Sequence, residues 1–215
     1  MKLHWDTITP AMRQVLLTFS SSVIGNHFYL AGDTALALQL CHRHSIDLDF
    51  FSPDQDIPSI VSPIQDALGK FNPNLADSSW GNLVFVADGV RVGFYGYGFS
   101  LVKPIIHLGS IKLASMVDIG LMKLDALLSR SSRKDFHDLY AICQHISLQT
   151  LLGLAPEKFP YVRDFEAQVV RHLVYFDRAE HETPVPLIDD IPWETVKDWF
   201  RGQAISIGQS WLAGS

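Results

Sequence analysis

A strand, a glycine turn and a helix follow one another near the N-terminus, and this order limits the fold more than any other feature of the sequence. Residues 28–31 are apolar and predict a short strand, which Gly32 ends. Strong helix formers follow it, so a helix is expected to begin at Asp33 or Thr34 and to run to residue 40. A glycine turn at a helix N-terminus offers backbone N–H groups and the positive end of the helix dipole to phosphate oxygens. The alternative is an ordinary capped helix start that binds no ligand.

The next predicted strand, residues 46–51, carries two aspartates. Side chains two residues apart project from the same face of a strand, so Asp47 and Asp49 can share one divalent cation. Carboxylate oxygens suit Mg²⁺ or Mn²⁺, and a metal held in this way can neutralise a triphosphate and orient an attacking hydroxyl. The alternative is a polar strand edge that faces solvent.

The remaining pattern predicts an α+β fold with a mixed sheet flanked by helices. Helices are expected at residues 9–23 and 57–68, a hairpin with an Asp-Gly turn at residues 83–92, and a short strand at residues 111–113. The C-terminal part is helical, with helices expected at residues 116–128, 134–145, 148–154, 162–174 and 193–211. We therefore expect an α/β core over residues 1–114 and a helical domain over residues 115–215.

Charge and composition narrow the class of partner. The formal net charge of −6 opposes non-specific binding to nucleic acid, so an RNA partner would need a local basic patch. The N-terminus lacks the pattern of a signal peptide, and no apolar run approaches the roughly 20 residues that cross a bilayer. We expect a cytoplasmic protein without a membrane segment.

Four stretches of the sequence resemble the signature of the AbiEii/AbiGii toxin family, whose members are bacterial nucleotidyltransferase-like proteins. These stretches are residues 28–40, 42–52, 118–124 and 130–140, and the similarity extends to about residue 175. The resemblance implies a DNA polymerase β-like nucleotidyltransferase core with a helical C-terminal part. It also implies a nucleoside-triphosphate donor, a divalent metal, and a toxin role beside a cognate antitoxin or in phage defence.

The resemblance also assigns roles to residues of the core. Asp47 and Asp49 match the metal-binding pair of the family, and the turn formed by Gly32, Asp33 and Thr34 matches its phosphate-cradling turn. The implied reaction moves a nucleotide to a hydroxyl of an RNA, such as a tRNA-like end, or of a protein.

Further roles fall in the helical part. Lys123 is similar to a helical lysine of the family that could neutralise phosphate charge, although a lysine on a helix is ordinarily solvated. Lys134 and Asp135 resemble a later basic-acidic motif, and Arg130 is expected to contact phosphate or the acceptor. The alternatives are a helix-capping role for Asp135 and plain surface charge for the basic residues.

Two positions depart from the family pattern. Asp33 stands where a small residue is usual, and its charge would oppose a triphosphate unless a cation offsets it. Gly93 stands where polymerase β-like enzymes usually supply a third carboxylate. These departures keep open a second hypothesis, a catalytically impaired protein that uses the fold for binding. A third hypothesis is metal-dependent phosphodiester hydrolysis, but the sequence identifies no residue as the general base that this reaction needs.

Overall fold

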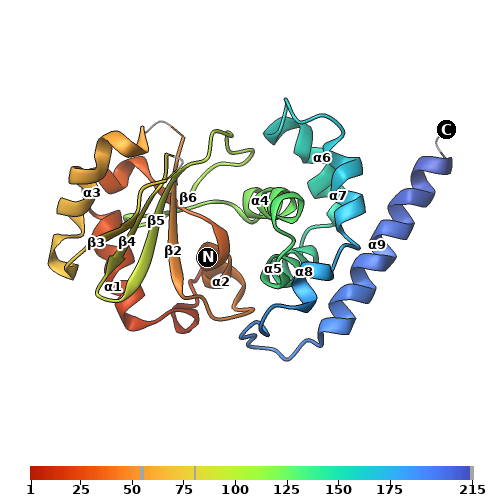
Figure 1. Cartoon of the computed structure of the whole chain (residues 1–215), viewed down its shortest axis with the longest axis horizontal. Coiled ribbons are helices and arrows are strands. Elements are labelled where there is room, and N and C mark those ends of the chain that lie inside the picture. Colours follow the sequence, from red (N-terminus) through yellow and green to blue (C-terminus); the bar gives the residue numbers. More distant parts are fainter. Residues whose placement is uncertain (54–55, 80, 214–215) are drawn as a thin grey trace. The chain divides into compact units, whose positions relative to one another are not determined.

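The structure is a computed structural model that describes residues 1–53, 56–79 and 81–213. The chain divides into two compact units, Met1–Ser115 and Met116–Ser215. The fold class is α+β as predicted, since a mixed sheet flanked by helices forms the first unit and the second is helical (Figure 1).

A seven-stranded sheet forms the centre of the first unit in the part of the chain that the structure describes, with the strand order β3-β4-β5-β2-β1-β7-β6. β2 pairs with β5 and β1 with β7 in parallel, whereas the other neighbours are antiparallel. The strands are β1 (Tyr29–Leu30), β2 (Asp47–Ser52), β3 (Asn74–Asp77), β4 (Leu83–Ala87), β5 (Val90–Gly96), β6 (Ile106–Leu108) and β7 (Ile111–Leu113).

Aromatic packing fixes which face of the sheet is buried. In α1 (Pro10–Ser20), Phe19 packs against Phe50 of β2 and Phe94 of β5, with ring centroids 4.6 and 4.9 Å away. Figure 1 shows α1 and α3 (Val61–Ala67) on this side of the sheet and α2 (Gly32–Leu40) on the other. Because strand side chains alternate, Asp47 and Asp49 point away from the Phe19 core. Short 3₁₀ segments lie at Trp5–Thr7, Ile24–His27, Ile57–Ile60 and Gly69–Phe71.

The hairpin predicted from the Asp-Gly turn is present. Asp88 and Gly89 both have positive φ angles, 48° and 80°, which the tight turn between β4 and β5 requires. The strands β3 and β6 were not predicted. The four residues of β3 are all exposed, so its sequence lacks the apolar alternation that marks a strand.

Six helices form the described part of the second unit. They are α4 (Met116–Ser129), α5 (Arg133–Cys143), α6 (Leu148–Lys158), α7 (Phe165–His172), α8 (Asp177–Glu180) and α9 (Trp193–Ala213). Phe136 of α5 packs against Phe176, Trp193 and Phe200 at centroid distances of 5.1 to 5.7 Å, which ties α9 to α5. No helix in the described part of the chain combines the length and apolar character that a membrane span requires.

Candidate functional site

The two aspartates of β2 share the face opposite the aromatic core. The side chains of Asp47 and Asp49 are 28% and 24% exposed, whereas Leu48 and Phe50 between and beside them are buried. Nη1 of Arg91 lies 3.8 Å from Oδ2 of Asp47 and 4.0 Å from Oδ1 of Asp49. A partly exposed pair of carboxylates on one strand face is a donor set that fits a single hard divalent cation.

The glycine turn lies directly against this pair. The helix α2 begins at Gly32, one residue before the expected start, and its N-cap residue Ala31 provides no side-chain cap. Gly32 has a φ of +64°, and a Cβ placed on it would lie 3.4 Å from Oδ2 of Asp49. The backbone N–H of Ala31 donates to the carbonyl of Asp49 at 3.1 Å. The start of the helix, where Ala31 provides no side-chain cap, therefore lies beside a carboxylate that can bind metal.

Replacing Gly32 by alanine should lower the free energy of unfolding by about 1 kcal/mol, because a left-handed conformation disfavours a Cβ. It should also weaken Mn²⁺ binding about tenfold, since the methyl group would lie in van der Waals contact with Oδ2 of Asp49 and restrict the approach of a cation to it. The matched control is Gly109→Ala, because Gly109 has a φ of +62° and, among the described residues, open space where a Cβ would lie. Urea unfolding and Mn²⁺ titration check this, and equal Mn²⁺ affinity in the two variants would contradict it.

Asp33 is paired with an arginine. Nη2 of Arg43 lies 2.9 Å from Oδ2 of Asp33, and both side chains are nearly buried, at 5% and 12% exposure. Arg43 also donates to the carbonyl of His44 at 3.1 Å. A guanidinium therefore balances the charge that was expected to oppose a triphosphate. Sequence reasoning missed Arg43 because it lies in a polar turn, beyond the end of the helix whose start it contacts.

Thr34 connects α2 to β2. Its side chain is 1% exposed, and its hydroxyl bonds to Oγ of Ser45 at 2.7 Å and to the carbonyl of Asp47. The hydroxyl is thus used inside the fold, and the backbone N–H is the group that Thr34 can offer to a phosphate.

The strand β5 adds residues that sequence reasoning missed. The parallel register places Arg91 beside Asp47 and Gly93 beside Asp49. The Tyr95 hydroxyl donates a hydrogen bond to Asp49 and accepts one from Arg91. The available signal was the two-residue spacing of Arg91, Gly93 and Tyr95, which puts all three on one face of the strand.

A second group of predicted residues meets within the helical unit. Nζ of Lys123 lies 3.0 Å from Oδ1 of Asp135 and 2.5 Å from Oδ2 of Asp138. Lys123 is 3% exposed and both carboxylates are fully buried, so the solvated-lysine alternative is wrong. Arg130 binds Asp135 through two hydrogen bonds of 2.7 and 2.8 Å, and Ser132 donates a third of 2.6 Å. Lys134 is half-buried in the first turn of α5.

Asp135 is ionised in the folded protein. Burial alone would raise its pKa, but the charge of Lys123 and the hydrogen bonds from Arg130 and Ser132 hold the pKa well below its usual range. The folded chain therefore releases this proton more readily than the unfolded chain does, and the carboxylate stabilises the fold at neutral pH.

We expect this contribution to be complete above about pH 5 and to disappear as the pH falls below the unfolded pKa of about 4. The free energy of unfolding measured by urea titration from pH 7 to pH 3 should decline more steeply for the wild type than for Asp135→Asn. Parallel pH profiles of the two proteins would contradict this prediction.

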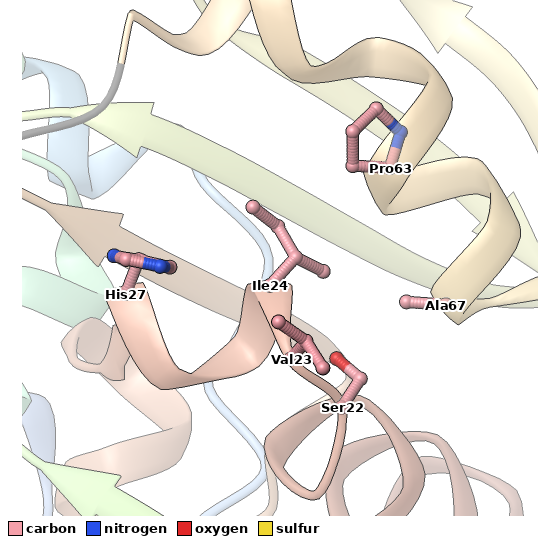
Figure 2. Close-up of a pocket in the computed structure, with 6 residues that line it drawn as sticks. All are labelled: Ser22, Val23, Ile24, His27, Pro63 and Ala67. Carbon is pink, nitrogen blue, oxygen red and sulfur yellow. The ribbon is translucent and has the colours of Figure 1, made fainter.

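One cavity of about 340 Å³ in the first unit is apolar. It is lined by Ser22, Val23, Ile24, His27, Pro63 and Ala67, from the segment after α1 and from α3 (Figure 2). None of the predicted site residues lines it, and its surface is nearly all apolar, which does not suit a triphosphate.

Comparison with known proteins places the chain. No protein-family model matches it. The uncharacterised protein aq_aa25 of Aquifex aeolicus (strain VF5) is 34% identical over 198 residues, which is 88% of this chain and 92% of that protein.

Two solved structures from Helicobacter pylori are similar over nearly the whole chain. A candidate nucleotidyltransferase has a TM-score of 0.58 and 16% identity, with 95% of this chain and 94% of that chain covered. The protein JHP933 has a TM-score of 0.49 and 14% identity, with 94% of each chain covered. The similarity to the first of these structures shows the fold of this chain. The chain thus has a nucleotidyltransferase-like fold and belongs to the same protein family as aq_aa25 of Aquifex aeolicus.

Proposed function

We propose that this chain is a Mg²⁺-dependent nucleotidyltransferase of the AbiEii/AbiGii toxin family. One observation supports the activity above all others: the start of α2 at Gly32 lies against Asp49, which shares a strand face with Asp47. A phosphate-binding turn and a metal-binding carboxylate pair are the two parts that nucleotidyl transfer needs in one place.

The reaction transfers a nucleotide to a hydroxyl. The hydroxyl oxygen of the acceptor attacks the α-phosphorus of a nucleoside triphosphate, and a new O–P bond forms. The bond from the α-phosphorus to the bridging oxygen breaks, pyrophosphate leaves, and the hydroxyl proton passes to solvent. Asp47 and Asp49 would hold Mg²⁺ or Mn²⁺, which supplies charge neutralisation and orientation of the hydroxyl when bound. The N–H groups at the start of α2 would bind phosphate oxygens.

Residues 1–114 would form the catalytic core and residues 115–215 a helical domain. In the helical domain, Arg130 keeps a side-chain exposure of 44% while it binds Asp135. We assign phosphate contacts with the nucleotide or an RNA acceptor to a local basic patch of Arg130 and Lys134. Lys123 and Asp135 would hold Arg130 in place.

The proposed biological setting rests on the resemblance to the AbiEii/AbiGii toxin family. The protein would act in the cytoplasm as the toxin of a toxin–antitoxin or phage-defence pair, and a cognate antitoxin would restrain it. Its substrates would be a nucleoside triphosphate and an RNA or protein hydroxyl.

The activity is tested with the full chain, Mg²⁺ and each of four α-³²P-labelled nucleoside triphosphates. Total RNA and total protein serve as acceptors, with EDTA and Asp49→Ala as controls. We expect labelled RNA or protein that requires both Mg²⁺ and Asp49. Absence of Asp49-dependent labelling with every nucleotide and both acceptors would refute the activity.

A second candidate function is a non-catalytic binding protein. The observation that favours it is the guanidinium of Arg91, which lies within 4.0 Å of both carboxylates and competes with a metal for them. Calorimetric titration separates the two functions, because this alternative requires that neither Mg²⁺ nor any nucleoside triphosphate binds.

A further inference from the structure

Tyr95 occupies the space beside Asp49 in which polymerase β-like enzymes usually place a third carboxylate. Gly93 pairs with Asp49 across the β2–β5 ladder, so a side chain on Gly93 would project beside the Asp49 carboxylate. A Cβ built on Gly93 would lie 2.3 Å from the hydroxyl oxygen of Tyr95 and 2.4 and 2.5 Å from two of its ring carbons. The ring of Tyr95 therefore lies over Gly93 and occupies the volume that an acidic side chain would need there.

The hydroxyl of Tyr95 forms hydrogen bonds with the two charged residues beside it, Asp49 and Arg91. Its hydroxyl donates to Asp49 and accepts from Arg91. A tyrosine phenol has an ordinary pKa of about 10, so it is neutral at pH 7 and remains a hydrogen-bond donor. The ring of Phe51, two residues beyond Asp49, lies 5.2 Å from the Tyr95 ring and supports it.

The charge of this arrangement limits how many cations it can hold. Asp47, Asp49, Arg91 and Tyr95 together carry a formal net charge of −1 at pH 7, whereas three carboxylates would carry −3. Two divalent ions about 4 Å apart repel each other strongly and depend on bridging carboxylates. A neutral phenol beside a guanidinium cannot provide that compensation.

We propose that Tyr95 and Arg91 replace the third carboxylate, so that the site binds one divalent cation and Tyr95 positions Asp49 as its ligand. This inference rests on the nucleotidyltransferase function proposed above. Tyr95 acts here through Asp49, as a positioning residue.

The test counts Mn²⁺ ions bound to the full chain by electron paramagnetic resonance of free Mn²⁺. We expect one ion per wild-type chain and loss of that ion in Asp49→Asn. Tyr95→Phe keeps the ring over Gly93 and removes the hydroxyl that donates to Asp49 and accepts from Arg91, so the Kd for Mn²⁺ should rise about tenfold with an unchanged count. An unchanged Kd would overturn the positioning role, and two ions per wild-type chain would overturn the single-cation site.

A double variant tests the replacement directly. Tyr95→Ala removes the ring, and Gly93→Asp then has room for a third carboxylate. The combined variant should bind two Mn²⁺ ions, whereas Tyr95→Ala alone should bind one. If the double variant still binds one ion, Tyr95 does not stand in for a third ligand.

The labelling assay distinguishes failure of this inference from failure of the proposed function. Asp49-dependent labelling together with two Mn²⁺ ions in the wild type would overturn the inference and leave the function intact. Absence of both Asp49-dependent labelling and Asp49-dependent Mn²⁺ binding would overturn both.

Discussion

Lys123→Met is expected to lower the free energy of unfolding by about 3–5 kcal/mol. The ammonium of Lys123 lies within 3.0 Å of the buried carboxylates of Asp135 and Asp138, and methionine would leave both without it. Breaking a buried ion pair costs more than the pair contributed, because the remaining charge stays in a poorly solvating environment. Urea unfolding of the full chain measures the loss, and hydrogen exchange across α4 and α5 locates it.

The control for this variant is Arg171→Met, which removes an exposed positive charge from α7 in the same unit and should change stability by less than about 0.5 kcal/mol. Adding Asp138→Leu to Lys123→Met should restore part of the stability, because an apolar pair replaces the broken ion pair. If the unfolding curve of Lys123→Met matched that of the wild type, the buried ion pairs of Lys123 with Asp135 and Asp138 would not stabilise the fold as proposed. If Lys123→Met is destabilised as expected, a loss of labelling in this variant is explained by misfolding of the helical unit.

The strand, turn and helix order of the core was predictable because its signals are local. The apolar run before Gly32, the helix formers after it and the Asp-Gly hairpin each act over a few residues. The edge strand β3 was not predictable, since its residues are exposed and its only support is pairing with β4.

The partners of the site residues were harder to predict because the register of distant segments sets them. Tyr95 reaches Asp49 only because β5 lies parallel to β2 with Gly93 opposite Asp49. Arg43 reaches Asp33 only when the chain folds back after α2. The sequence of α4 alone does not distinguish Lys123 from a surface lysine. Its burial is tolerated because Asp135 and Asp138 of α5 pair with its ammonium. Residue identity indicated the chemistry, and tertiary pairing determined which charges are balanced.

Asp49→Asn should lower the rate of nucleotide transfer about 10³-fold, or about 4 kcal/mol in activation free energy, without unfolding the protein. Asparagine keeps the size of aspartate and can still accept the hydrogen bond from Tyr95, while it removes the charge that holds the cation. Removing one of two neighbouring carboxylates also relieves repulsion, so the free energy of unfolding should stay within about 0.5 kcal/mol of wild type.

The matched comparisons for Asp49→Asn are Asp47→Asn and Asp66→Asn. Asp47→Asn should also reduce transfer, but by less, because Asp49 is the carboxylate that lies against the Gly32 turn and accepts from Tyr95. Asp66 is exposed on α3, on the far side of the sheet from the carboxylate pair, and its replacement should leave transfer unchanged. If Asp49→Asn transferred nucleotide at the wild-type rate, the carboxylate pair would have no role in the reaction. Loss of transfer with an unchanged unfolding curve would instead assign the reaction to the charge on this strand face, since the size of the side chain and its hydrogen bond from Tyr95 would be preserved.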